Sequence, residues 1–407
     1  MTHRRITILG ATGSVGSSTL DLISGHEDRF SIDTLTAYRN VAELARLARR
    51  YRARHAVIGQ ASLKGELEAA LAGSGISVAA GPEALCEAAM YPVDVVMAAI
   101  VGVAGLAPTL AAVRSQPVVA LANKETLVCA GAFFMSEVAR NGTLLVPVDS
   151  EHSALLQALG GPAFMLNPDF STVEELVITG SGGPFRTMKA GDLQRVTPQQ
   201  AVAHPVWSMG AKISVDSATL MNKTLEIIEA KHLFSIDEKR LNILIHPQSI
   251  VHGLVRFKDG SVVAQMAQPD MRVPISVALA WPDRIATPAA ALDLAKLASL
   301  TFEAPDEDRF PALRLARELL SAPGGGAAIA NAANEFAVDA FLNGRIAFTD
   351  IVRICEETLL KADGFSRPAP ASLEEALSLD DEARGIASEL ANASRPEIHS
   401  LGRANTA

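Results

Sequence analysis

Short apolar runs alternate with helical patterns over the N-terminal part of the chain. Short runs bounded by turn residues are typical of buried strands, and apolar residues spaced three or four apart are typical of helices. The run Arg4–Gly10 is followed by a glycine-rich turn and a helical stretch, and the runs Ser31–Tyr38 and His55–Gly59 follow with a second helical stretch between them. Strands that alternate with helices indicate a βαβ arrangement and a doubly wound parallel sheet.

Four further apolar runs extend this pattern. They are Ile76–Ala80, Val93–Ile100, Pro117–Ala122 and Thr143–Val148. The second of these is almost continuously apolar, as expected of a central parallel strand that is buried on both faces. Ligands bind at the carboxyl ends of the strands in such sheets, so polar residues that follow a strand are the first candidates for a site.

The turn after the first strand carries Gly10, Gly13 and Gly16 in a GxxGxxG pattern. Glycines at such a turn let the backbone approach a pyrophosphate, and the next helix offers its free amides. The spacing is one residue longer than usual, so only its βαβ context makes a Rossmann-like dinucleotide site credible. At the end of the second strand Arg39 favours NADP over NAD, unless it is a solvated loop charge. Asp33 is the acidic residue at the spacing expected for NAD, but it lies at the start of that strand, away from the cofactor.

Polar residues also leave the last two strands. Lys124 follows one of them, and Asp149, Ser150 and Glu151 follow the other. If the backbone remains extended, the two carboxylates point to the same side and favour a divalent cation of the Mg²⁺ or Mn²⁺ type. The alternative is that these residues cap the helix that begins at His152.

The chain changes character after Asn167. Glu174–Arg186 predicts a strand that ends in a glycine and serine turn containing Ser181. Thr197–Ser214 has little periodicity and carries His204 and Trp207, so the tryptophan is either a core residue or part of a lid over a ligand. Asp216–Phe234 then predicts one helix, capped by Asp216 or Ser217.

On this helix Asn222, Glu226 and Glu229 share one face, with Lys223 beside them. Such a face is either solvated or the source of a third metal ligand. The segment Leu241–Gln268 predicts three strands with a hairpin at Asp259 and Gly260, and we interpret His246 and His252 as structural.

Four amphipathic stretches after residue 310 predict a small helical bundle. They are Pro311–Leu320, Gly324–Leu342, Phe348–Leu360 and Ala371–Ala391.

Composition narrows the functional classes. The 407 residues are 49% hydrophobic and 20% charged, as in globular proteins. The net charge of −9, without a basic cluster, argues against nucleic-acid binding. We expect Cys86, Cys129 and Cys355 to be reduced core residues in a cytoplasmic protein. No signal peptide or membrane segment is expected.

Seven motifs together resemble the 1-deoxy-D-xylulose 5-phosphate reductoisomerase family. They occur in the family's order across roughly residues 5 to 345: LGATGSVGSSTLDLI, ALANKETLV, PVDSEHSAL, TGSGGPF, HPVWSMGAKISVDSATLMNKTLE, IHPQSIVHG and NAANEFAV. The resemblance implies NADPH- and metal-dependent rearrangement and reduction of 1-deoxy-D-xylulose 5-phosphate to 2-C-methyl-D-erythritol 4-phosphate, a precursor of isoprenoids. It also implies Mg²⁺, Mn²⁺ or Co²⁺ as the metal, and a homodimer.

The resemblance assigns roles to individual residues. It makes Asp149, Glu151 and Glu226 the metal ligands and places Lys124 and His204 with them in the catalytic set. The substrate-binding set adds Ser150, Ser181, Trp207, Ser217, Asn222 and Lys223, and Met209 lies with His204 and Trp207 on a flap. The NADPH-binding set is Gly10, Thr12, Gly13, Ser14, Val15, Arg39, Asn40, Asn123, Glu125 and Gly210.

The expected fold class is α/β. A Rossmann-like doubly wound parallel sheet over residues 1–149 precedes a central α+β catalytic domain over 150–285, with its flap at 198–210. A linker over 286–310 and a C-terminal helical bundle over 311–395 complete the chain.

Two other functions remain open at this stage. One is a metal-independent NADP-dependent dehydrogenase of a semialdehyde or hydroxy acid. The other is a catalytically silent NADP-binding regulator, in which Asp149, Glu151 and Glu226 are caps and surface charges.

Overall fold

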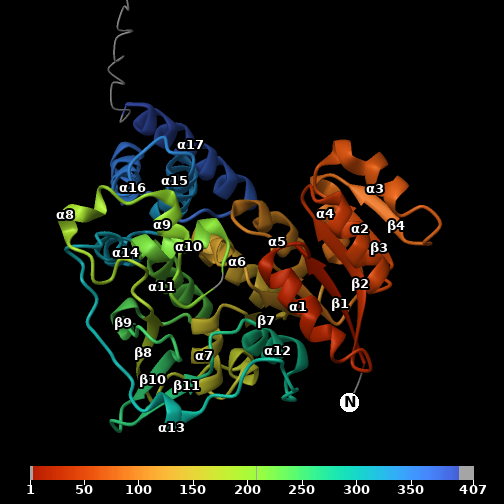
Figure 1. Ribbon diagram of the computed structural model, residues 1–407, viewed down its shortest axis with the longest axis horizontal. Helices are drawn as coiled ribbons and strands as arrows, with labels where there is room; N and C mark the ends of the chain where they lie inside the picture. Colours follow the sequence, from red (N-terminus) through yellow and green to blue (C-terminus); the bar gives the residue numbers. More distant parts are fainter. Residues whose placement is uncertain (1–2, 208, 394–407) are drawn as a thin grey trace, which may run out of the picture.

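The computed structural model describes residues 3–207 and 209–393. Within them, a seven-stranded sheet and a four-stranded sheet lie side by side, and a group of helices from the end of the chain packs above the smaller sheet (Figure 1). The α/β class and the Rossmann-like sheet are therefore confirmed. Residues 1–2, 208, 394 and 395 of the expected boundaries lie outside the described residues.

The larger sheet is parallel throughout and has the strand order β4-β3-β2-β1-β5-β6-β7. Its strands are β1 (Arg4–Leu9), β2 (Phe30–Ala37), β3 (His55–Ile58), β4 (Ser77–Ala80), β5 (Val95–Ala98), β6 (Val118–Leu121) and β7 (Leu144–Pro147). Chain order reverses between β1 and β5, which is where a crevice for a ligand forms in sheets of this kind.

Helices cover both faces of this sheet. They are α1 (Ser14–Ser24), α2 (Val41–Arg50), α3 (Lys64–Ala70), α4 (Pro82–Met90), α5 (Leu106–Val113) and α6 (Glu125–Asn141). Helices α3 and α6 were not identified in the sequence. α6 is kinked at Ala130. Most of its residues are buried, so its sequence lacks the one-sided apolar pattern of a surface helix.

Two glycines allow α1 to approach the sheet closely. Gly10 has φ +88°, and a Cβ there would lie 2.7 Å from the carbonyl oxygen of Ala99. A Cβ on Gly16 would lie 2.4 Å from the carbonyl oxygen of Gly10. Only glycine fits at these two contacts, and the start of α1 is thereby held at the end of β1.

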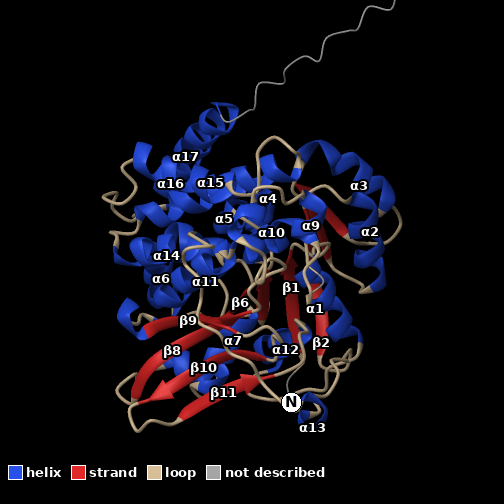
Figure 2. Ribbon diagram, turned by 60° about the vertical axis from the view of Figure 1, so that its left-hand side comes forward, coloured by secondary structure: helices blue, strands red, loops and turns tan. Residues whose placement is uncertain are grey.

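The smaller sheet has the strand order β11-β10-β8-β9, with β8 and β9 parallel and the other pairs antiparallel (Figure 2). Its strands are β8 (Val173–Gly180), β9 (Leu241–Ile245), β10 (Val251–Phe257) and β11 (Val262–Met266). The expected hairpin joins β10 to β11, with Gly260 at φ +86°. Helices α7 (Ser150–Ala158) and α11 (Met221–Phe234) pack against this sheet.

The prediction of a single helix over Asp216–Phe234 is wrong, and so is the prediction that the segment before it is irregular. Short helices α8 (Ala190–Leu193) and α9 (Pro198–Val202) are followed by α10 (Ala211–Thr219) and then α11. The break lies at Leu220, whose φ is +62° and whose side chain is buried. Asp216 and Ser217, the expected caps, both lie inside α10, and neither caps α11. No glycine or proline marks this break, so the sequence pattern could not show it.

The remaining helices are α12 (Arg272–Ala280), α13 (Leu294–Leu297), α14 (Ala312–Ser321), α15 (Gly325–Leu342), α16 (Asp350–Lys361) and α17 (Leu373–Ala393). Short 3-10 turns are η1 (Ala61–Leu63), η2 (Val103–Gly105), η3 (Pro162–Leu166) and η4 (Glu238–Arg240). α15 packs against α16, α17 and α6, which joins the end of the chain to the larger sheet.

The cysteines are all free. Cys129 and Cys355 are buried, as expected, whereas Cys86 is partly exposed on α4 and is not a full core residue. In residues 3–207 and 209–393, no helix has both the length and the apolar character needed to cross a bilayer.

The close approach of α1 gives a first test. We expect Gly16→Ala to lower the free energy of unfolding by about 2 kcal/mol, because the added methyl group collides with backbone that cannot move aside. Urea denaturation measures this change. Gly385→Ala is the matched control, because Gly385 lies in α17 with no atom near its Cβ position, and it should raise stability by about 0.5–1 kcal/mol. Equal effects of the two substitutions would contradict the steric explanation.

Candidate functional site

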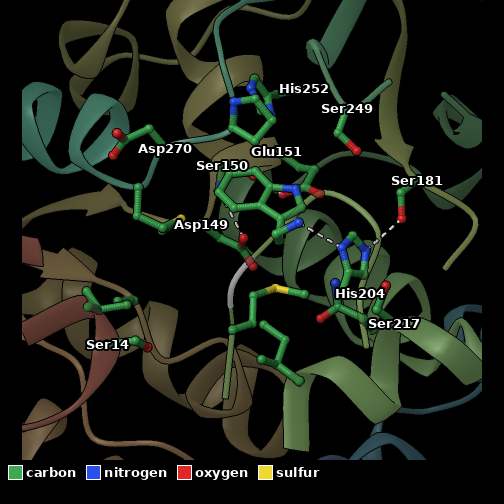
Figure 3. Close-up of a pocket in the computed structure, with 18 of the residues that line it drawn as sticks. Ser14, Asp149, Ser150, Glu151, Ser181, His204, Ser217, Ser249, His252 and Asp270 are labelled. Atoms are coloured by element: carbon green, nitrogen blue, oxygen red, sulfur yellow. Dashed lines mark hydrogen bonds between the residues drawn. The ribbon is translucent and has the colours of Figure 1, made fainter. Parts of the chain in front are cut away.

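A cavity of about 510 Å³ opens at the carboxyl edge of the larger sheet and extends to the smaller sheet (Figure 3). Its lining comes from the start of α1, the ends of β6, β7 and β8, the helices α10 and α11, and the segments around Trp207 and Asp270. A volume of this size is typical of small-molecule sites.

Asp149 both caps a helix and joins a cluster of acids. The chain leaves β7 at Pro147, and the Asp149 side chain accepts a hydrogen bond of 2.9 Å from the amide of Ser150, the first residue of α7. The extended backbone expected from Asp149 to Glu151 is therefore wrong, and the capping interpretation is right for Asp149. The helix nevertheless turns Glu151 toward the same point, so the two interpretations do not exclude each other.

Three carboxylates meet in the cavity. Oxygen atoms of Asp149, Glu151 and Glu226 all lie within 4.8 Å of one another. Lys124 Nζ forms ion pairs with Asp149 and, at 3.1 Å, with Glu226. Lys223 Nζ pairs with both Glu151 and Glu226. Two ammonium groups thus lie among three carboxylates.

The charges in this cluster shift one another's pKa values. Burial and the nearby Glu151 carboxylate raise the pKa of Glu226 to about 7, although Lys124 and Lys223 act in the opposite direction. Burial alone would lower the pKa of Lys124, but the carboxylates of Asp149 and Glu226 outweigh it and raise this pKa well above its usual value. Burial alone would raise the pKa of Asp149, but Lys124, His152 and Lys223 together outweigh it and the pKa is lowered. Such opposed shifts within one cavity are typical of functional sites.

The donor set fits a divalent cation. With both lysines charged and all three acids ionised, the cluster carries one uncompensated negative charge. Asp149 Oδ2 is buried and, although close to Lys124 Nζ, accepts no well-aligned hydrogen bond. Three carboxylates on rigid elements are the hard oxygen ligands that Mg²⁺ and Mn²⁺ prefer.

The polar face of α11 is buried rather than solvated. Asn222, Lys223, Glu226 and Glu229 are all buried, and Asn222 accepts a hydrogen bond of 2.9 Å from Lys124 Nζ. Glu229 lies behind the cluster, with its Oε2 3.4 Å from Nδ1 of His152. Burial raises the pKa of Glu229 to about 7, with His152 acting in the opposite direction.

His152 was not singled out in the sequence. Its Nε2 lies 2.9 Å from the carbonyl oxygen of Glu226, so this nitrogen carries the proton and donates it. Asp149, His152 and Glu229 also lie within 4.8 Å of one another, which makes a second group of potential metal ligands.

His204, Ser181 and Ser217 line the cavity beside the acids (Figure 3). His204 Nδ1 accepts hydrogen bonds from the amides of Val206 and Trp207, at 3.2 and 2.9 Å. Its Nε2 therefore carries the proton and donates to Ser181 Oγ at 2.9 Å. Burial, and next the charge of Lys223, lower the pKa of His204, which keeps this neutral tautomer in place.

Trp207 is not a core residue. It is partly exposed, lines the cavity and makes an edge contact with the ring of His252, with the ring centroids 5.9 Å apart. The lid interpretation therefore agrees with its position, and the interpretation of His252 as purely structural does not. His246 is buried and stacks on Phe302, as a structural residue would.

The expected cofactor residues other than Gly210 lie at one edge of the larger sheet, because they follow the parallel strands β1, β2 and β6. Gly10, Thr12 and Gly13 follow β1, and Ser14 and Val15 begin α1 and line the cavity. Arg39 and Asn40 follow β2; Arg39 is exposed, and Asn40 accepts a hydrogen bond from the amide of Glu43 as the cap of α2.

Asn123, Glu125 and Gly210 have structural contacts of their own. Asn123 donates to the carbonyl oxygen of Gly102 at 3.0 Å and accepts from the amide of Thr126. Glu125 is buried and pairs with Lys212, and Gly210 caps α10. None of the three lies among the residues that line the cavity.

The sequence missed one wall of the cavity. Ser249, Asp270, Met271 and Arg272 line it, and Arg272 forms a 2.6 Å ion pair with Asp21 of α1. This pair links the two halves of the cavity across about 250 residues of chain. The only local signal was a positively charged residue at the first position of an otherwise apolar helix, α12.

Three family models match successive parts of the chain. The model described as 1-deoxy-D-xylulose 5-phosphate reductoisomerase matches residues 6–131. A second model, described as 1-deoxy-D-xylulose 5-phosphate reductoisomerase C-terminal domain, matches residues 145–234. The third, described as DXP reductoisomerase C-terminal domain, matches residues 266–386.

Similar full-length proteins carry the same name. The reductoisomerase of Zymomonas mobilis subsp. mobilis is 53% identical over 94% of this chain and 96% of its own. The reductoisomerase of Rhodospirillum centenum is also 53% identical, over 96% of this chain and 95% of its own. Solved structures give the same result. That of the Zymomonas mobilis enzyme in complex with NADPH has a TM-score of 0.87 at 49% identity, covering 96% of this chain and 99% of that one. A solved DOX-P reductoisomerase in complex with NADPH, fosmidomycin and magnesium has a TM-score of 0.91 at 41% identity, covering 96% of this chain and 98% of that one. With these matches over nearly its whole length, the chain belongs to the 1-deoxy-D-xylulose 5-phosphate reductoisomerase family.

Proposed function

We propose that the protein converts 1-deoxy-D-xylulose 5-phosphate to 2-C-methyl-D-erythritol 4-phosphate, using NADPH and a divalent cation. The observation that carries this function is the meeting of three carboxylates and two lysines beside the crevice of a Rossmann-like sheet. A reaction that rearranges a sugar phosphate and then reduces the product needs both parts in one cavity.

Asp149, Glu151 and Glu226 would hold the cation. When bound, a divalent ion supplies Lewis-acid chemistry, because it lowers the pKa of a sugar hydroxyl and polarises a carbonyl. The two lysines now neutralise the acids that a cation would neutralise. With the cation present, Lys124 and Lys223 would be free to donate hydrogen bonds to oxygen atoms of the substrate, as would Ser150 beside them.

The phosphate would bind where donors gather next to the acids. Ser181, His204, Ser217, Asn222 and Lys223 all line that part of the cavity. A charge-assisted hydrogen bond contributes about 1.5–3 kcal/mol, so several of them fix the substrate far from its reacting carbons. Trp207 and Met209, which line the cavity, would then exclude water from the aldehyde that the rearrangement forms before it is reduced.

NADPH would bind along the carboxyl edge of the larger sheet. The amides at the start of α1, from Gly13 to Val15, would receive the pyrophosphate, and Arg39 would meet the 2′-phosphate. NADPH supplies the hydride when bound. Lys124 and Glu125 follow β6 at the same edge, which puts the substrate end of the cavity next to the expected nicotinamide.

We further propose that the protein forms a homodimer through the smaller sheet. β11 is an edge strand, and an apolar hollow of about 300 Å³ lies on the sheet, lined by Val177, Ile243, Leu254, Val262 and Phe302. Val262 and Phe302 are 53% and 41% exposed, which is unusual for large apolar side chains so close together. A second copy of the sheet would cover them.

The free cysteines support a cytoplasmic location.

The third metal ligand gives a direct test. We expect Glu226→Gln to lower turnover by about 1,000-fold or more, because the buried carboxylate is lost where the cation would bind. NADPH affinity, measured by fluorescence titration, should change by less than about threefold, since Glu226 lies on α11, whereas the expected pyrophosphate site is at the start of α1. Glu238→Gln is the matched control, because Glu238 forms only a partly exposed ion pair with Lys231. Weakened NADPH binding with retained turnover would count against the assignment.

Removal of the metal separates this function from a metal-independent dehydrogenase. We expect EDTA to abolish NADPH oxidation with 1-deoxy-D-xylulose 5-phosphate, and Mg²⁺ or Mn²⁺ to restore it, because uncompensated carboxylates cannot activate the sugar. NADPH binding should be unchanged under both conditions. Full activity in EDTA would favour the dehydrogenase.

The dimer is tested by a charge placed in the apolar hollow. Phe302→Glu should shift the molar mass measured by light scattering from that of a dimer to that of a monomer, because a buried unpaired carboxylate is costly. Leu360→Glu is the control, since Leu360 is 68% exposed on α16, far along the chain from this sheet. A wild-type monomer, or a dimer unaffected by Phe302→Glu, would contradict the proposed interface.

A further inference from the structure

Lys212 lies where a cation is unfavourable. It is the second residue of α10, directly after the flap, and the first turn of a helix attracts negative charge. Its partner four residues later is Asp216, and a lysine that precedes its acid is the weaker order for such a pair. Local helix chemistry therefore does not account for a lysine here, and tertiary contacts must.

Two buried carboxylates supply those contacts. Lys212 Nζ lies 3.0 Å from Glu125 Oε1 and 2.8 Å from Asp216 Oδ2. The side chains of Glu125 and Asp216 are only 7% and 2% exposed. Burial alone would raise the pKa of Glu125, but Lys212 and a backbone hydrogen bond together outweigh it and lower this pKa.

The contact continues into the C-terminal helices. Asp216 Oδ1 accepts a hydrogen bond of 2.8 Å from Asn334 on α15, within the NAANEFAV motif. Asn334 is completely buried, and α15 packs against both α6 and α10. Glu125, Lys212, Asp216 and Asn334 thus form one polar chain across three helices, and we call these four residues the anchor chain.

Helix α10 therefore has two sides with different contacts. Lys212 and Asp216 belong to the anchor chain, whereas Ile213 and Ser217, each one residue later, line the cavity. Glu125 follows Lys124, whose ammonium lies among the three acids. A shift of α10 along its axis would move Ser217 and the end of the flap relative to the acids.

We propose that Lys212 is a positioning residue that holds α10, and with it Ser217 and the end of the flap, against the start of α6 and the C-terminal helices. This inference rests on the proposed function, because it names how the same cavity is assembled. Lys212 itself does not line the cavity and would touch no reacting atom.

Hydrogen exchange in the protein without ligands tests the anchor directly. Lys212→Met keeps the aliphatic stem and removes the charge, so amides of residues 211–217 should exchange about tenfold faster than in the wild type. Lys212→Arg should return the rate to within about threefold, because a guanidinium can pair with both acids. Lys231→Met is the matched control: its side chain is 30% exposed, against 24% for Lys212, and it should leave these amides unchanged.

Kinetics give the functional consequence. The KM of Lys212→Met for 1-deoxy-D-xylulose 5-phosphate should rise about tenfold while kcat falls by less than about threefold, because substrate capture needs Ser217 and the flap in place. The fluorescence change of Trp207 on substrate binding, measured in a Trp281→Phe background, should shrink in parallel. If Lys212→Met fails to fold, Glu125→Gln replaces it in the exchange experiment, with an expected acceleration of about threefold.

The outcomes are separable. Unchanged exchange over residues 211–217, or kinetic changes equal to those of Lys231→Met, would overturn the role of Lys212. Absence of wild-type turnover would overturn the proposed function alone, because the exchange experiment needs no substrate.

Discussion

Buried charge compensation is the constraint on which this structure depends. Carboxylates that follow β7 and lie on α7 and α11 face ammonium groups that follow β6 and lie on α11, and most of these side chains are buried. A buried charge without a partner costs several kcal/mol, so Asp149, Glu226, Lys124 and Lys223 are stable only when all are present together. The requirement fixes the relative placement of elements that are about 100 residues apart in the chain. It also leaves a net negative charge that a divalent cation would neutralise.

The rest of the fold holds these elements in place. Parallel strands deliver Asp149, Glu151 and Lys124 to one edge of the larger sheet, and Gly10 and Gly16 bring α1 to the same edge. The smaller sheet supports α7 and α11 from the other side. The C-terminal helices contribute no residue to the cavity, yet α15 reaches α10 through Asn334.

Helix α11 connects these layers. Its cavity side carries Asn222, Lys223 and Glu226, and Glu229 lies behind them against His152. His152 in turn donates to the main-chain carbonyl of Glu226, so α7 and α11 support each other on both sides of the acids. Groups that hydrogen-bond the residues around a metal site commonly set its geometry, and this pair occupies that position.

Local pattern was enough to predict the alternation of strands and helices, the glycine turn, the four C-terminal helices and the family motifs. It also indicated that Asp149 and Glu151 follow a strand and that Glu226 and Glu229 share one face of a helix. Long-range packing was needed to show that Asp149 caps α7 and still faces Glu226, that Leu220 breaks the helix, and that the polar face of α11 is buried. Arg272, His152 and Lys212 were missed for the same physical reason: their partners, Asp21, the carbonyl of Glu226 and Glu125, are distant in the chain. Contacts between distant residues leave no periodic signal in a single sequence, whereas strand alternation and helix spacing do.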